Sequence, residues 1–170
     1  SYHAVVFFNY DFAVRTHAVR LAEPWLDESR SLFDLVVRLS DDPDAKVRLQ
    51  VALSLGQSQN PAALTALAQL AVRSGGEPWM DDAILSSVGT TSDQLLAILL
   101  AQADALGQAQ RLLAPLASMA GARHDDQQIG RVLATIAGAT GAGAAAVQAV
   151  CMEGLSEGLQ RGKARVLSSA

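Results

Sequence analysis

The sequence predicts an all-α solenoid built from antiparallel helix pairs, and two observations lead to this prediction. First, the segment 44–56 recurs at a spacing of 33 residues, as 11–23 before it and as 77–89 after it. Each copy begins with an acidic residue and continues with an apolar helical face, a pattern typical of repeat arrays. Second, half of the residues are hydrophobic but only 5% are aromatic, which favours packed helices over sheets. We expect about four repeats and a terminal helix.

The first repeat is predicted to contain helices over 13–22 and 27–39. Glu23 ends the first helix because Pro24 follows it, and the residue before a proline is pushed out of the helical region. The second helix has apolar residues at a helical spacing, which predicts one buried face. These residues are Leu32, Leu35, Val36 and Leu39.

The second repeat has the clearest helix boundaries. Gly56 is expected to end its first helix in a left-handed cap. Asn60 as N-cap and Pro61 at the first helical position open its second helix, which the glycines at 75 and 76 stop. The residues expected to face inward are Val47, Val51, Leu53 and Leu55 in the first helix, then Leu64, Leu67, Ala68 and Ala71.

The later helices are predicted from the same cap and breaker residues. Pro78 opens a helix that Gly89 closes, and Ser92 is a candidate N-cap for a helix over 93–106. Pro115 should kink a helix over 109–120 or mark its true start. An Asp pair caps the next helix, and a last helix covers about 144–160.

These predictions divide the chain into three segments. Residues 1–10 fit no repeat and are predicted to be a separate N-terminal segment. Residues 11–162 form the repeat domain, and 163–170 form a frayed tail.

The residues of the repeat resemble those of a known family. Residues 42–57, DPDAKVRLQVALSLGQ, are similar to the first-helix motif of HEAT repeats, with an acid, a Val-Arg pair, an apolar stripe and a final glycine. The resemblance implies helix pairs stacked into a right-handed superhelix. The third copy departs from the motif, because Asp81 stands where the arginine of the Val-Arg pair is expected.

A narrower resemblance covers residues 13–162. The order of segments is similar to the HEAT region of large bacterial multidomain proteins, which also have a propeller resembling sugar dehydrogenases and a haem-binding cytochrome c domain. That resemblance implies a spacer segment of a larger protein, in a bacterial cytoplasm or periplasm. It implies no cofactor here, because the chain has no CxxCH haem-attachment motif.

Charge and composition exclude several classes of function. A net charge of -4 and an isoelectric point near 5.2 argue against a nucleic-acid partner. The apolar runs are too short to span a membrane, so we expect a soluble protein. The single cysteine, Cys151, is expected to be an inert core thiol, and no metal site is predicted.

Two repeated acid and arginine pairs are candidates for a structural ladder. Asp11 with Arg15, and Asp44 with Arg48, are four residues apart and could bridge on a helix. Their recurrence suggests that they link neighbouring repeats.

Two near-duplicate segments, EPWLD and EPWMD, place Trp25 and Trp79 beside acids. The simpler interpretation is that Pro-Trp opens a helix with the indole folded over the turn. Alternatively, the two indoles line a surface that binds a sugar or a peptide.

We expect a non-enzymatic scaffold that binds a protein, or neighbouring domains of a parent protein, in the groove lined by the second helices. The alternative is a small hydrolase, for example a glycosidase, that uses Asp27 and Asp81 or His124 and Asp125. Catalysis would need such groups to converge in one pocket, whereas a scaffold would leave them dispersed. A third hypothesis is self-association through uncapped ends of the array.

Overall fold

The structure is a computed structural model that describes residues 6–102, 106–141 and 143–168. The side chains are described as far as residue 161. All regular structure in these ranges is helical, so the predicted all-α fold is confirmed. The contacts divide the chain into two compact units, Ser1–Ser87 and Val88–Ala170, which we call unit 1 and unit 2. The repeat domain expected over 11–162 includes residues of both units and stays a prediction.

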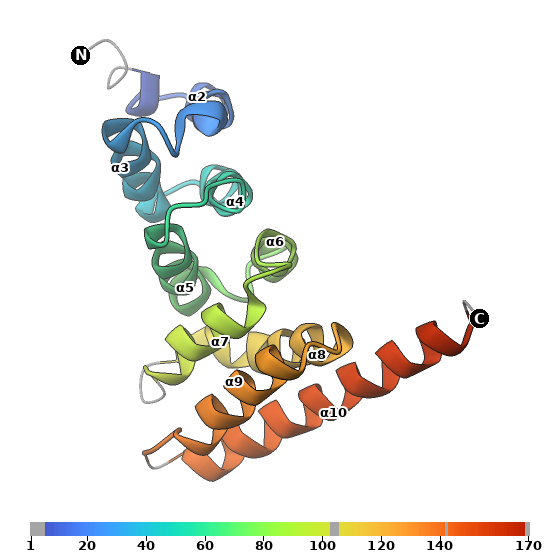
Figure 1. The fold of residues 1–170 in the computed structure, drawn as a ribbon. Coiled ribbons are helices and arrows are strands. Elements are labelled where there is room, and N and C mark those ends of the chain that lie inside the picture. Colours follow the sequence, from blue (N-terminus) through green and yellow to red (C-terminus); the bar gives the residue numbers. More distant parts are fainter. Residues whose placement is uncertain (1–5, 103–105, 142, 169–170) are drawn as a thin grey trace. The chain divides into compact units, whose positions relative to one another are not determined.

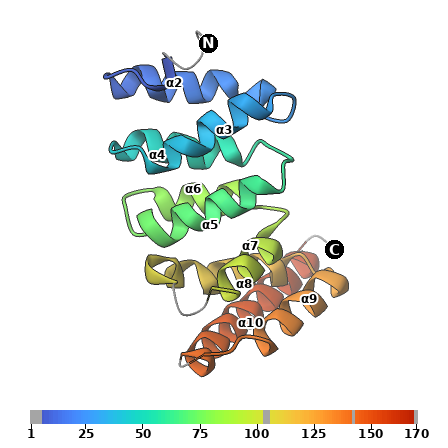
Figure 2. The same cartoon turned by 90° about the vertical axis from the view of Figure 1, so that its left-hand side faces the viewer.

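Unit 1 consists of helix pairs arranged in two layers (Figures 1 and 2). The first layer contains α2 (Phe12–Ala22), α4 (Ala45–Leu55) and α6 (Met80–Ser87). The second layer contains α3 (Arg30–Arg38) and α5 (Ala62–Ser74). Short 3₁₀ turns, Glu23–Trp25 and Leu39–Asp41, follow α2 and α3. The antiparallel helix pairs that the repeat predicts are therefore present.

Side-chain caps explain where several helices begin. Asp11 accepts a hydrogen bond from the amide of Ala13 at 2.8 Å, and Asp44 accepts one from Lys46 at 2.8 Å. Such a bond satisfies one of the amide groups that the first turn of a helix leaves unpaired. Asn60 caps α5 in the same way, as predicted, by accepting from Ala62 at 3.0 Å.

The core of unit 1 lies between the two layers and corrects three details of the sequence analysis. Leu53 is 40% exposed, whereas Ser54 beside it is fully buried. Phe33 is buried in α3, while Leu32 and Leu35 are only half-buried. Gly56 has φ of −66°, which is right-handed, so it is not a left-handed cap. Its role is steric, because a Cβ there would lie 2.5 Å from the Cβ of Ser87.

Unit 2 contains four α-helices within the described residues: α7 (Ser92–Leu100), α8 (Leu113–Ala122), α9 (Asp126–Ala137) and α10 (Ala144–Ser168). A 3₁₀ segment, Gly107–Leu112, precedes α8, so Pro115 lies in the first turn of a helix, where a missing amide is tolerated. Asp125 is the N-cap of α9, as predicted.

Glycines allow α8 and α10 to pack closely. A Cβ on Gly154 would lie 2.3 Å from the carbonyl oxygen of Ala114, and one on Gly158 would lie 2.0 Å from that of Ser118. On the facing helix, a Cβ on Gly121 would lie 2.6 Å from the carbonyl oxygen of Leu155. Real Cβ atoms do not approach a carbonyl this closely, so these glycines set the separation of the two helices.

Two predicted boundaries in unit 2 differ from the structure. The helix expected over 93–106 ends at Leu100, and Ser92 does not cap it. At the other end, α10 continues to Ser168, through residues that we assigned to a frayed tail. Lys, Ala, Arg and Leu in this stretch are strong helix formers, which explains the longer helix. In the described ranges no single helix is long and apolar enough to cross a membrane, and α6 with α7 meets that test only as an interrupted pair.

Candidate functional site

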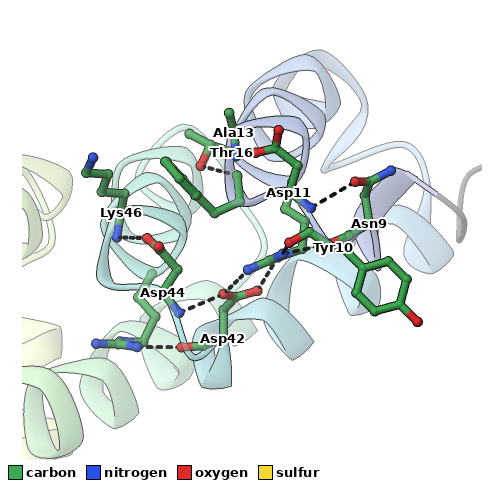
Figure 3. Close-up of polar contacts among 11 residues, drawn as sticks. Asn9, Tyr10, Asp11, Ala13, Thr16, Asp42, Asp44 and Lys46 are labelled. Atoms are coloured by element: carbon green, nitrogen blue, oxygen red, sulfur yellow. Dashed lines mark hydrogen bonds and ion pairs between the residues drawn. The ribbon is translucent and has the colours of Figure 1, made fainter.

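A buried ion pair joins the first two repeats of unit 1. The guanidinium of Arg15 in α2 donates from Nε to Asp42 Oδ2 and from Nη2 to Asp42 Oδ1, both at 2.7 Å. The side chains are 10% and 3% exposed, so water screens the pair weakly. The hydrogen bond with Asp42 raises the pKa of Arg15 above its ordinary value. Figure 3 shows Asp42 beside Asp44, near the residues at the starts of α2 and α4.

Arg15 and Arg48 pair with other acids than the ones that we predicted. Asp11 and Asp44 are occupied as N-caps of α2 and α4, so neither pairs with the arginine four residues later. Arg15 instead bonds Asp42, and it also donates to the carbonyl oxygens of Asn9 and Tyr10. The within-helix pairing is therefore wrong, because a short aspartate at an N-cap is held by the backbone amides of its own helix.

The second repeat uses its arginine in a related way. Arg48 in α4 donates from Nη2 to Glu77 Oε1 at 2.6 Å and from Nη1 to the carbonyl oxygen of Asp42 at 2.5 Å. Glu77 precedes α6, so this pair links the second repeat to the third. The side chains are 15% and 31% exposed.

Further polar links join the repeats at the opposite ends of the first-layer helices and in the turns. Glu23 Oε1, after α2, accepts from Ser54 Oγ at 2.7 Å. Asp27 accepts from Ser58 Oγ at 2.5 Å and from the amide of Gln59 at 2.9 Å. The bond from Ser58, followed by that from Gln59, lowers the pKa of Asp27. Asp27, a candidate catalytic acid, thus holds the turn of the next repeat.

The two tryptophans lie at opposite ends of the first layer. Trp25 follows α2 and is half exposed, and Trp79 precedes α6 and is 73% exposed. Trp25 lines a cavity of about 360 Å³ whose other walls are apolar. The other lining residues are Val6, Phe7, Ala18, Leu21, Ala22 and Leu32. The structure therefore does not bring the two indoles together on one binding surface.

The remaining candidate catalytic residues are also dispersed. Asp81 accepts a hydrogen bond from the amide of Gly76 at 3.2 Å, in the turn before α6. His124 and Asp125 belong to unit 2, where His124 has φ of 54° in the turn and Asp125 caps α9. None of the three unit 1 cavities that we describe is lined by any of these residues or by Asp27. Within the described part of the chain, no three His, Cys, Asp or Glu side chains lie together as a metal site would need.

A groove separates the second helices of the first two repeats. It is a cavity of about 290 Å³ between α3 and the start of α5, and it has an apolar floor and a polar rim. Phe33 and Ala66 are buried in the floor. Arg30, Asp34, Thr65 and Gln69 are exposed along the rim. Arg30 and Asp34 form an exposed ion pair at 3.1 Å, worth at most about 1 kcal/mol.

Sequence reasoning missed Asp42 and the groove residues Thr65 and Gln69. The positions 33 residues before and after Asp42 hold Asn9 and Gly75, so the repeat gives no sign of an acid there. The only signal in the sequence is the run of acids at 41, 42 and 44, just before α4. No repeated sequence pattern marks Thr65 and Gln69. Only the packing of α3 beside α5 brings them to one groove.

Comparison with known proteins gives one match. Residues 9–87 match the protein family described as HEAT repeats. A comparison with curated proteins found no match, and neither did a comparison with solved structures. The matched residues end where unit 1 ends. They contain the helix pairs and the inter-repeat ion pairs described above, so residues 9–87 are similar to HEAT repeats in sequence and in helix arrangement.

Proposed function

We propose that unit 1 is a scaffold that binds a protein partner in the groove between α3 and α5. The observation that supports this function is the anatomy of the groove. A buried apolar floor surrounded by exposed polar residues is the usual arrangement of a protein interface. HEAT repeats also commonly mediate protein interactions, which supports a protein rather than a small molecule as the partner.

The polar groups of unit 1 support the same proposal by their distribution. The buried or half-buried acids and arginines at the starts of the first-layer helices, such as Asp42 and Arg48, join one repeat to the next. On the groove rim, Thr65 and Gln69 make no side-chain hydrogen bond with the residues that the structure describes. A partner could therefore bond to them without breaking a contact that stabilises the fold.

The hydrolase alternative has weaker support. Its candidate residues Asp27, Asp81 and Asp125 each hold a turn or a helix start, and they lie in different turns. Two carboxylates, or a histidine and a carboxylate, would have to face one pocket for acid and base catalysis. The described cavities offer no such arrangement, so we favour the scaffold.

The partner is either a separate protein or a neighbouring domain of a longer protein. The narrower resemblance to the HEAT region of multidomain bacterial proteins supports the second choice. In that case the chain is a segment of a larger protein, and it positions domains that carry the chemistry elsewhere.

Site-specific photo-crosslinking tests the proposal. A photoreactive amino acid at Thr65, on the groove rim, is compared with the same amino acid at Ala45, an exposed residue in the first turn of α4. We expect one defined protein to be crosslinked from Thr65 and not from Ala45. Equal crosslinking from both positions, or from neither, would count against the groove.

Self-association is a second candidate, favoured by the apolar cavity beside Trp25. Leu21 is 70% exposed and Trp25 is 50% exposed, so burying them against a second copy would be favourable. Sedimentation velocity at increasing protein concentration tests this. The larger species should disappear in Leu21→Glu, whereas a constant monomer mass in the unaltered chain would rule the candidate out.

A further inference from the structure

A third cavity of unit 1 lies on the first layer, away from the α3 and α5 groove. It has a volume of about 470 Å³ and is lined by residues of α2, α4 and α6 and the turns that follow α2 and α4. The lining residues are Arg20, Glu23, Gln50, Leu53, Gly56, Gln57, Ser86 and Ser87. This volume falls within the range of small-ligand sites. The wall is largely polar, unlike that of the cavity beside Trp25.

Hydrogen bonds within the protein leave the two serine hydroxyls of this cavity as acceptors. Ser86 donates its hydroxyl hydrogen to the carbonyl oxygen of Ala83, and Ser87 donates to that of Ala52, both at 2.9 Å. A serine hydroxyl has only one hydrogen, so both oxygens can only accept from a ligand.

Gln50 also presents a hydrogen-bond acceptor to the cavity. Its Nε2 donates to Ser54 Oγ at 3.0 Å and to Glu23 Oε1 at 3.3 Å, which uses both amide hydrogens. Its side-chain carbonyl oxygen remains as an acceptor. Together with the Glu23 carboxylate, these oxygens form an acceptor wall with one negative charge, which favours a cation with several N–H groups.

Arg20 gives the cavity its second charge. It lies in the last turn of α2, three residues before Glu23, and its side chain is exposed. It makes no ion pair with Glu23, and its guanidinium has no hydrogen-bond partner within the described part of the chain. An arginine fork without a partner is suited to a carboxylate.

We propose that this cavity binds a small zwitterion that has both a guanidinium or ammonium group and a carboxylate, the class that includes the basic amino acids. The cationic group bonds Glu23, Gln50 and the two serine oxygens. The carboxylate of the ligand bonds Arg20. Neither the groove partner nor the scaffold role is needed for this site.

Titration of the ¹⁵N-labelled chain with three probes tests the proposal. L-Arginine has both charged ends, agmatine has no carboxylate, and L-citrulline replaces the guanidinium with a neutral group of the same shape. The side-chain amide signals of Gln50 and Gln57 report on the cavity directly. We expect saturable shifts with L-arginine, binding at least about tenfold weaker with agmatine, and no saturable shift with L-citrulline.

Matched variants locate the contacts. Glu23→Gln removes the charge but keeps an oxygen that accepts from Ser54 and Gln50, so the fold is retained and L-arginine should bind at least about tenfold more weakly. Arg20→Gln should reduce L-arginine binding to the level of agmatine. Arg38→Gln removes an exposed arginine of α3 that does not line the cavity and should leave binding unchanged.

Three results would overturn the proposal. The first is no saturable shift with L-arginine up to about 10 mM, which corresponds to negligible affinity. The second is L-citrulline binding as well as L-arginine. The third is L-arginine binding that Glu23→Gln leaves unchanged.

Discussion

Arg48 holds Glu77 through a single hydrogen bond of 2.6 Å, whereas Arg15 holds Asp42 through two of 2.7 Å. The position equivalent to Asp42 in the next repeat is Gly75, which has no side chain. Glu77 replaces the missing acid from two residues later. As a consequence, Arg48 Nε and Glu77 Oε2 are buried without a hydrogen-bond partner within the described structure. The buried polar atoms of the Arg48–Glu77 pair are thus less completely hydrogen-bonded than those of the Arg15–Asp42 pair.

Removing Asp42 should destabilise unit 1 strongly. In Asp42→Ala the guanidinium of Arg15 stays buried without its counter-charge, and the amide of Asp44 loses the acceptor that it bonds at 2.9 Å. We expect the free energy of unfolding to fall by about 3 to 5 kcal/mol. Denaturant unfolding followed by the fluorescence of Trp25 and Trp79, both in unit 1, measures this change.

The neighbouring acid provides a matched control. Asp41 pairs with Arg73, but the two side chains are 62% and 47% exposed. Asp41→Ala should therefore cost at most about 1 kcal/mol. If the two alanine variants had equal stability, the buried pair would not be what joins the first two repeats.

The surroundings of two glycines in unit 2 predict opposite effects when each is replaced by alanine. Gly158→Ala places a Cβ 2.0 Å from the carbonyl oxygen of Ser118, so the helices must separate, at a cost of roughly 1 to 3 kcal/mol. Gly130→Ala, in α9, meets nothing within 4 Å and should stabilise the helix by roughly 0.5 to 1 kcal/mol. Thermal unfolding by circular dichroism distinguishes them. Gly158→Ala being as stable as the unaltered chain would contradict the close packing.

The links from Ser58 and Gln59 to Asp27 predict a dependence of stability on pH. The folded pKa of Asp27 is below its ordinary value of 3.8. Its contribution is therefore present above the unfolded pKa and is lost as the pH falls through the folded pKa. Unfolding midpoints between about pH 2 and pH 6 should fall less steeply in Asp27→Asn than in the unaltered chain.

Glu28 is the control for this pH profile. It is the exposed neighbour of Asp27 and accepts no hydrogen bond from the residues that the structure describes. Glu28→Gln should retain the pH dependence of the unaltered chain. A profile that changes equally in both variants would show that the effect comes from net charge and not from the bonded carboxylate.

Cys151 should resist thiol reagents in the folded protein. Its side chain is fully buried, and burial raises its pKa to about 11. Because the thiolate is the reactive form, labelling at neutral pH should require unit 2 to open. Pulsed labelling with a maleimide across a denaturant series measures this opening. Complete labelling without denaturant, at the rate of a free thiol, would contradict the packing of α10.

The repeat spacing predicted the helix pairs correctly because caps and breakers act locally. Asp11, Asp44 and Asn60 each begin a helix through contacts within three residues, which the sequence shows directly. Asp125 does the same in unit 2. The buried faces were predicted less well, since the neighbours of Leu53 and Phe33 depend on how the layers pack.

The candidate site could not be predicted from the sequence for the same reason. Arg15 and Asp42 are separated by 27 residues, and Glu23 and Ser54 by 31. The aspartates four residues before each arginine are plausible partners by spacing. In the structure they instead accept hydrogen bonds from backbone amides at the starts of α2 and α4. The groove and the first-layer cavity each combine residues from successive repeats, so only the stacking of those repeats creates them.

The most direct test of the scaffold function is the affinity of the partner captured from Thr65 for two arginine variants. Thr65→Arg introduces a long cation on the groove rim, and Ala45→Arg introduces the same side chain on the exposed face of α4. Isothermal titration should show at least about tenfold weaker binding for Thr65→Arg and unchanged binding for Ala45→Arg. Equal affinities for the two variants would contradict binding in the groove between α3 and α5.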